Sequence, residues 1–264
     1  MTIRSARAMT QIGGIAFILL VPLLNKNGIG LIAGTYYSLS IGPVWITDPV
    51  IAFQTLLTTM HMDAALIASL IVPVGAALIF GRVFCGWVCP QNTISELADR
   101  LASQIGCKRL FSPAPHPVVR YIVLALLLIA TAVTSLPLVS LLSAPGILSV
   151  QTAGLIRQGA VGVELALIGV ILIAELFVVR RGWCNFICPV GSVLGLIRWK
   201  RTMRVVFSEE GGKVCGGCAH CAQACQLGLD PVAGKIAPQC HNCGDCITAC
   251  EKIDAARKPL SFRF

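Results

Sequence analysis

Long apolar runs separated by short polar segments dominate this chain of 264 residues. Four of the runs reach, or nearly reach, the roughly 20 residues that an α-helix needs to cross a bilayer. The predicted spans cover residues 9–24, 64–80, 121–142 and 160–179. The pattern therefore predicts an α-helical integral membrane protein with four transmembrane helices.

A fifth apolar region, residues 29–59, differs from these runs because glycines and prolines interrupt it. Such residues break regular helices and favour turns. We interpret the region as a loop or a half-inserted hairpin at the membrane surface. A full span here would place the following loops on the wrong sides of the bilayer.

The basic residues predict the orientation of the four spans. All 21 Lys and Arg residues except Lys26 and Arg157 lie before the first span, between the second and third, or after the fourth. Cytoplasmic loops carry the excess of Lys and Arg in membrane proteins. We therefore expect a multi-pass membrane protein with both termini in the cytoplasm.

Composition narrows the class of protein further. Apolar residues make up 56% of the chain and charged residues only 12%, about half the usual share, which excludes an ordinary soluble globule and a disordered chain. The net charge of +9 does not indicate nucleic-acid binding, because the basic residues flank apolar runs and form no long basic helix with interleaved aromatics.

Thirteen cysteines carry the strongest chemical signal, and the densest group lies near the C-terminus. A C-x2-C-x2-C-x3-C run begins at Cys215 and is repeated from Cys240, 25 residues later. This spacing is typical of bacterial ferredoxins, in which three thiolates hold one iron–sulfur cluster and the fourth serves the other cluster. We therefore predict two 4Fe-4S clusters in a small α+β ferredoxin domain that covers residues 206–264. Residues 1–205 form the membrane domain.

The cross-sharing rule predicts the ligands of each cluster. We expect each fourth cysteine to start a short helix that carries it to the neighbouring cluster. A pair of zinc sites is the alternative, but zinc favours two C-x2-C knuckles separated by a longer loop. Gln226 and Glu251 stand where ferredoxins usually have proline after the fourth cysteine. The predicted ligands are Cys215, Cys218, Cys221 and Cys250 for one cluster, and Cys240, Cys243, Cys246 and Cys225 for the other.

Two C-x3-C-P motifs follow the second and fourth predicted spans and form an internal repeat. We expect the prolines, Pro90 and Pro189, to begin new helices, where proline is favoured. If the halves pack as a pseudo-symmetric pair, the four thiols converge and hold a third cluster or another thiophilic metal. Disulfides or thiols used only in packing are the alternatives. The motif cysteines are Cys85, Cys89, Cys184 and Cys188; Cys107 lies outside every group.

The combined motifs resemble those of the NapH-type ferredoxins. These are quinol dehydrogenase membrane components tied to periplasmic nitrate reductase. The resemblance rests on the four spans, the paired C-x3-C-P motifs, the terminal two-cluster module and the segment from Gly34 to Tyr37. It implies that the protein oxidises membrane quinol and passes electrons through a partner iron–sulfur protein toward a periplasmic reductase.

Two other functions stay open at this point. Related proteins that share the C-x3-C-P motifs reduce copper during oxidase assembly, so a metal-handling role is one alternative. The other is a redox sensor, in which the clusters report rather than conduct. All the cysteines are predicted on the cytoplasmic side, whereas the acceptor that the resemblance implies is periplasmic. Either the quinol reacts near the cytoplasmic face, or electrons cross the bilayer through a group that this sequence does not contain.

Quinol oxidation also requires a proton acceptor, and ionisable residues in or near a membrane segment are candidates. Glu164 and Glu175 lie on roughly one face of the fourth predicted span, with Glu164 near the outer surface. His61 and Asp63 lie at the outer start of the second span. Solvation explains Glu164, His61 and Asp63 equally well, and an ion pair with Arg180 or Arg181 explains Glu175.

Overall fold

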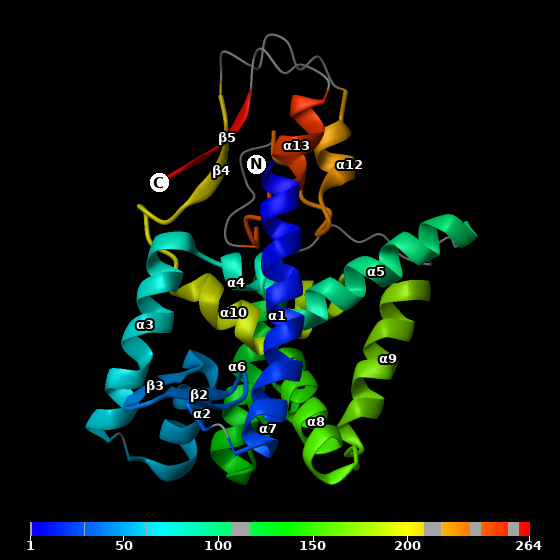
Figure 1. Ribbon diagram of the computed structural model, residues 1–264. Coiled ribbons are helices and arrows are strands. Elements are labelled where there is room, and N and C mark those ends of the chain that lie inside the picture. The colour runs from blue at the N-terminus through cyan, green and yellow to red at the C-terminus, as the bar shows by residue number, and fades with distance from the viewer. Residues whose placement is uncertain are drawn as a thin grey trace.

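In the computed structural model, the described residues are 2–28, 30–61, 63–106, 117–208, 218–232, 239–252 and 259–264. Helices form one end of the molecule, and a smaller module from the C-terminal part of the chain forms the other (Figure 1). The first helix, α1 (Ile3–Lys26), runs along the helical part and ends against this module. The two ends of the chain therefore meet on one side of the protein.

Helix α1 is longer than its sequence pattern predicts, because Thr2 caps its N-terminus and accepts a hydrogen bond from the amide of Ser5. Of the described helices, α1 and α6 (Pro117–Thr134) are long and apolar enough to cross a bilayer. Helices α3 (Ala64–Phe80) and α9 (Glu164–Phe177) also coincide with predicted spans, but they have 17 and 14 residues. Two of the described helices thus have the length and apolar composition of a membrane span, and α3 and α9 are shorter than a span requires.

The interrupted apolar region folds into a small sheet and a helix rather than a simple loop. Strands β1 (Ile32–Gly34), β2 (Ser38–Ile41) and β3 (Val44–Thr47) pair antiparallel in sequence order. Helix α2 (Pro49–Thr59) follows, capped by Asp48. Because β1 contacts α1 and β3 contacts α3, the sheet joins these two helices.

The third predicted span is wrong at its C-terminal end. Helix α6 ends at Thr134, and α7 (Leu138–Leu141) is a separate short helix. Pro137 explains the break, since proline lacks an amide hydrogen and disfavours helix in the residue before it. A further helix, α8 (Ala144–Gln158), was not predicted; it packs against α1 and α9.

Four short elements surround the C-x3-C-P motifs. The first motif forms α4 (Val83–Trp87) and leads into α5 (Pro90–Ile105). The second forms a π-helix, η1 (Trp183–Ile187), and leads into α10 (Pro189–Leu196). The two halves of the helical part thus repeat the same order: an apolar helix, a short helical turn with the first cysteine, and a new helix after the second.

The C-terminal module contains helices α12 (His220–Ala224) and α13 (Asp245–Glu251) and a two-stranded antiparallel sheet of β4 (Arg204–Phe207) and β5 (Leu260–Arg263). Its core contains Val205, Ile247 and Leu260, and Ile3 of α1 packs against it. The N-terminal turn of α1 therefore supports the module directly.

Candidate functional site

The four cysteines of the C-x3-C-P motifs line one small cavity between the two halves of the helical part. Cys85 and Cys89 come from the first half, and Cys184 and Cys188 from the second. Cys89 is buried, and the other three are partly buried. The fold thus brings together four soft sulfur ligands that are about 100 residues apart in sequence, the donor type that iron–sulfur clusters prefer.

The second cysteine of each motif precedes a helix. Cys89 caps α5 and Cys188 caps α10, and the prediction that Pro90 and Pro189 begin new helices is confirmed. Helix N-termini stabilise negative charge. Burial nevertheless raises the pKa of Cys89, and it raises the pKa of Cys188 to about 11. These two thiols are therefore protonated at neutral pH and would release their protons to a bound metal.

A pair of buried arginines links the halves across this cavity. Arg82 and Arg181 each lie three residues before the first cysteine of a motif, and both are buried. Arg181 donates to the carbonyl and side-chain oxygens of Asn92 at 2.8 and 3.0 Å. Arg82 lies against Gly191, where a Cβ would be 2.4 Å from Nη2. Asn92 and Gly191 are the third residues after the two second cysteines, so each arginine reaches the equivalent position of the opposite motif.

A third arginine, Arg120 at the start of α6, adds positive charge to the same place. It is 1% exposed, its Nη2 would lie 3.1 Å from a Cβ on Gly191, and both terminal nitrogens lack a hydrogen-bond partner among the described residues. Buried charges require a compensating partner. A cluster ligated by four thiolates is an anion, so the residues present fit such a group in both donor type and charge. No described group of three or more His, Cys, Asp and Glu side chains is set to hold a metal ion.

A second cavity in the C-terminal module is lined by the four cysteines predicted to hold one cluster: Cys225, Cys240, Cys243 and Cys246. Of the other predicted set, Cys221 and Cys250 are buried in the core of the module, and Cys218 is exposed. Cys215 and Cys107 lie outside the described residues. The module therefore groups the cross-shared fourth cysteine of the first run with three cysteines of the second.

The prediction that the fourth cysteine of each run starts a short helix is wrong. The fourth cysteine does not start a helix: Cys225 follows the last residue of α12, and Cys250 lies in the last turn of α13. The helix begins instead near the third cysteine of each run, at Cys221 and Cys246. Four residues span about one helical turn, so the helix itself separates the third and fourth ligands.

His241 lines both cavities and connects the two cysteine groups. Burial, and then the positive charge of Arg82, lower the pKa of His241, so its ring is neutral. The loop around it docks on the first motif: Arg82 donates to the carbonyl of Gln239 at 2.6 Å, and Trp87 Nε1 donates to that of Asn242 at 2.9 Å. A Cβ on Gly86 would lie 2.8 Å from the carbonyl oxygen of His241, which shows how closely the segments approach.

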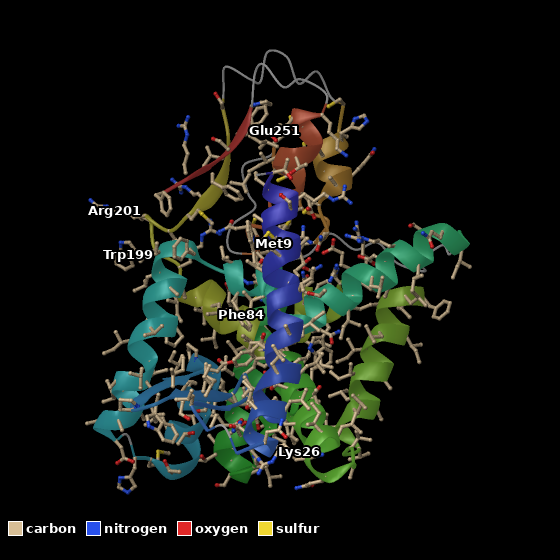
Figure 2. All side chains as sticks on the ribbon, viewed as in Figure 1. Met9, Lys26, Phe84, Trp199, Arg201 and Glu251 are labelled. Carbon is tan, nitrogen blue, oxygen red and sulfur yellow. The ribbon has the colours of Figure 1, made fainter. Side chains whose placement is uncertain are left out.

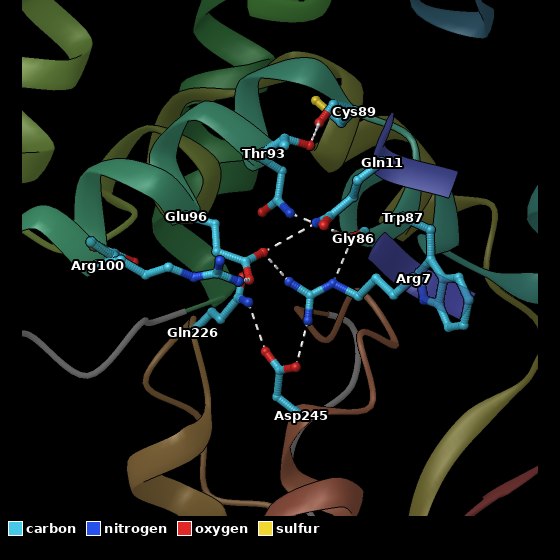
Figure 3. Close-up of polar contacts among 12 residues, drawn as sticks. Arg7, Gln11, Gly86, Trp87, Cys89, Thr93, Glu96, Arg100, Gln226 and Asp245 are labelled. Carbon is cyan, nitrogen blue, oxygen red and sulfur yellow. Dashed lines mark hydrogen bonds and ion pairs between the residues drawn. The ribbon is translucent and has the colours of Figure 1, made fainter. Parts of the chain in front are cut away.

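A polar network holds the other side of the module (Figure 3). Arg7 of α1 forms ion pairs with Glu96 of α5 and Asp245 of α13. Gln226 donates to Asp245 at 2.7 Å. The residue that replaces the usual ferredoxin proline thus joins this interface. Burial alone would raise the pKa of Glu96, but Arg7, with Gln11 and Arg100, lowers it.

The four proton-acceptor candidates are not gathered at either cavity. Glu175 is buried in α9, in electrostatic contact with Arg181 and within reach of Ser95. Glu164 accepts a hydrogen bond from Gln151 at 2.9 Å. His61 and Asp63 are exposed. Sequence reasoning used Arg120 only to orient the spans. Arg120 lies 31 residues after Cys89 and 64 before Cys184, so no local pattern placed it beside the cysteines.

The comparisons with known proteins agree with this grouping. Residues 62–106 and 161–206, which each contain one C-x3-C-P motif, match the model of a family described as a 4Fe-4S binding domain. The methylamine utilization ferredoxin-type protein MauN of Methylorubrum extorquens is 30% identical over 226 residues, which cover 84% of this chain and 74% of MauN. The chain belongs to the NapH and MauN family of ferredoxin-type proteins. No solved structure matches it.

Membership in the NapH and MauN family confirms the resemblance drawn from the motifs. The ferredoxin-type protein NapH of Haemophilus influenzae is 28% identical over 260 residues, which cover 94% of this chain and 86% of NapH. The NapH of Escherichia coli is 29% identical over 237 residues, covering 85% and 79%. Together with the 4Fe-4S match, these relatives assign the chain to iron–sulfur electron transfer.

Proposed function

We propose that this protein is a membrane-bound electron-transfer subunit that takes electrons from quinol. It passes them through a partner iron–sulfur protein toward a periplasmic reductase such as nitrate reductase. The observation that carries this proposal is the shared wall between the cysteine cavities, because His241 lines both of them. A bound cluster supplies one-electron transfer, so adjacent cluster sites form a relay.

Each part of the chain has a defined task in this function. Cys85, Cys89, Cys184 and Cys188 hold a third 4Fe-4S cluster, and the buried arginines Arg82, Arg120 and Arg181 neutralise its negative charge. The eight cysteines of the C-terminal module hold two more clusters, in the sets predicted from the sequence. Arg7 and His241 keep the module seated on the helical part.

The protein lies in the bacterial inner membrane with helices α1, α3, α6 and α9 across the bilayer and the module in the cytoplasm. The membrane domain ends just before β4, two residues earlier than the predicted boundary, so that the module begins at Arg204. Large apolar side chains that are exposed on all four helices support this topology; they include Ile12, Ile71, Leu126 and Val170. Trp199 is 70% exposed, and it projects with Arg201 beside the module end of α3 (Figure 2), as interfacial residues do.

The test is the iron and sulfide content of the full-length protein, purified without oxygen, with paramagnetic resonance of the reduced form. We expect about twelve irons per chain, as three four-iron clusters require. Replacing all four C-x3-C-P cysteines by serine lowers this to about eight irons and removes one resonance signal. The Cys107→Ser variant is the control for general loss of thiols.

Other outcomes would separate the alternatives. Eight irons in both wild type and the four-cysteine variant, with about one copper that only the wild type binds, would replace the third cluster by a copper site. A colourless protein that contains zinc would contradict the proposal as a whole. If the clusters form but quinol never reduces them, the iron–sulfur electron-transfer role stands, and quinol is not the electron donor.

A further inference from the structure

A third cavity, of about 620 Å³, lies between α1 and α3 and does not belong to either cysteine group. Its size falls within the range of about 300–1,000 Å³ that is usual for small-molecule sites. Its lining is mainly apolar and includes Phe17, Phe80 and Val190. Phe80 is also 45% exposed on the outer surface, so this side chain forms part of the rim. The cavity therefore offers an apolar slot beside the middle of α1 and the C-terminal end of α3, two helices proposed to span the bilayer.

A few polar groups converge on this slot. Asp48 lies at its wall, between β3 and α2, together with Thr35 and Thr47. Its Oδ1 accepts a hydrogen bond from the amide of Val50 at 2.9 Å, and Oδ2 has no hydrogen-bond partner among the described residues. Burial raises the pKa of Asp48 to about 6. One oxygen thus holds the loop in place, and the other is free to accept a hydrogen bond or a proton beside a mainly apolar cavity.

An aromatic row connects the cavity to the C-x3-C-P cysteines. The ring centroids of Phe17 and Tyr36 are 5.2 Å apart, and those of Tyr36 and Phe84 are 5.7 Å apart. Tyr36 donates to the carbonyl of Gly14 at 3.0 Å, which fixes its ring. Phe84, which precedes Cys85 and lies beside α1 (Figure 2), lines both this cavity and the four-cysteine cavity, as does Val190. A single layer of side chains therefore separates the two.

We infer that this cavity binds the ring of a membrane hydroquinone and that Asp48 accepts its protons. The inference rests on the proposed function, because that function supplies the oxidant. Oxidation to the quinone breaks two O–H bonds and releases two protons and two electrons. The protons pass in turn to the Asp48 carboxylate and then to water. The electrons pass one at a time to the iron–sulfur cluster ligated by the four cysteines.

The cavity can be filled without disturbing the fold. Gly13 of α1 lines it, and a Cβ at this position meets no atom within 4 Å. Gly13→Phe therefore places a ring in the open space. Gly169→Phe is the matched control, because Gly169 also lies in an apolar helix, has no atom within 4 Å of its Cβ, and does not line the cavity.

Binding is measured with full-length protein in lipid nanodiscs, by the fluorescence change of heptyl-hydroxyquinoline N-oxide, a hydroquinone analogue. This readout does not depend on cluster reduction. We expect Gly13→Phe to weaken binding about tenfold or more, and Gly169→Phe to bind like wild type. If the analogue binds Gly13→Phe with wild-type affinity, the hydroquinone ring does not bind in this cavity, and the inference is overturned.

The role of Asp48 is tested with Asp48→Asn, which keeps a good helix cap but no longer accepts a proton. We expect unchanged binding of the analogue and about a hundredfold slower reduction of the clusters by quinol, the usual cost of losing a general base. The matched control is Asp230→Asn, since Asp230 also precedes proline and valine, and its Oδ1 accepts from the amide of Val232 at 2.9 Å.

The two proposals fail in different ways. Reduction by dithionite should be the same in wild type and all four variants, which shows that the clusters are intact. If quinol reduces Asp48→Asn at the wild-type rate, the proton acceptor is overturned and the proposed function stands. If the wild-type protein contains no clusters, the proposed function fails. Weaker binding of the analogue to Gly13→Phe than to wild type would still support a quinol site in this cavity.

Discussion

The two C-x3-C-P motifs are built alike in their backbones. In each, the amide of the second cysteine donates to the carbonyl five residues earlier, at 2.9 Å: Cys89 to Phe84, and Cys188 to Trp183. Both motifs then enter a helix at a proline. Such wide turns are frequent at functional sites. The shared geometry aims the two second cysteines into one cavity from opposite halves.

Their surroundings differ. The first motif lies between two cavities, because Phe84 lines both, and its loop docks on residues 239–242. The second motif is a regular π-helix, and Cys184 packs against the core of the module. We conclude that the repeat supplies the four ligands, while the departures from the repeat determine what each side of the site contacts.

The largest expected effect is the loss of iron from single cysteine variants, which tests whether the two motifs share one site. We expect Cys85→Ser and Cys184→Ser each to abolish the same resonance signal and to lower iron by about four per chain. A shared cubane is lost when either half loses a ligand. Iron analysis and paramagnetic resonance measure this, and Cys107→Ser is again the control. Two variants that each lose a different, smaller share of metal would show separate sites.

The equivalent arginines should differ in their contribution to stability. Arg181 pairs with Asp99 at 3.3 Å and donates twice to Asn92, so Arg181→Gln should cost about 3–5 kcal/mol. Arg82 donates once, to the carbonyl of Gln239, so Arg82→Gln should cost about 1–3 kcal/mol. Thermal unfolding in detergent measures both. An equal loss would mean that the two arginines have equivalent surroundings.

Gly86 and Asn185 occupy the same position of the repeat, one residue after the first cysteine. A methyl group on Gly86 would press on the backbone of His241, so Gly86→Ala should cost about 1–3 kcal/mol. Asn185→Ala removes one long hydrogen bond, of 3.4 Å to the carbonyl of Leu227, and should cost about 1 kcal/mol. Amide hydrogen exchange of residues 239–246 measures how often this loop separates from the first motif. Faster exchange in Asn185→Ala than in Gly86→Ala would contradict this ranking.

The smallest effect concerns pH. Helix α5 carries Glu96 where α10 has Gly195. Because Arg7 and its neighbours lower the pKa of Glu96 in the folded state, this carboxylate stabilises the docked module above its ordinary pKa of about 4.3. The stabilisation is lost as the pH falls through the lowered value. The melting temperature of the wild type should therefore fall more steeply than that of Glu96→Gln between about pH 5 and 3.

Local features of the site were predictable from the sequence. Proline has a fixed backbone angle that suits the first turn of a helix, so Pro90 and Pro189 were sufficient to predict two helix starts. Cysteine spacing likewise predicted which four side chains of the module line one cavity. Both rules act over a few residues, within one chain segment. The metal content of these cavities stays a prediction.

Features that depend on contacts between distant segments were not predictable. The broken apolar region becomes a sheet because β1 and β3 pack on α1 and α3, a contact that local composition does not encode. Gln226 looked like a departure from the ferredoxin pattern, yet its partner Asp245 gives it a docking role. The cavity beside Asp48 is lined by residues of seven helices and strands, from α1 to α10, and no single stretch of sequence contains it.

The meeting of α1 with the module has a consequence for biogenesis. Arg7 and its partner Asp245 are 238 residues apart in sequence. The module therefore cannot dock on α1 until almost all of the residues between them have been synthesised. Until then the four-cysteine cavity lacks the wall that His241 supplies, so an inorganic cofactor can enter from that side.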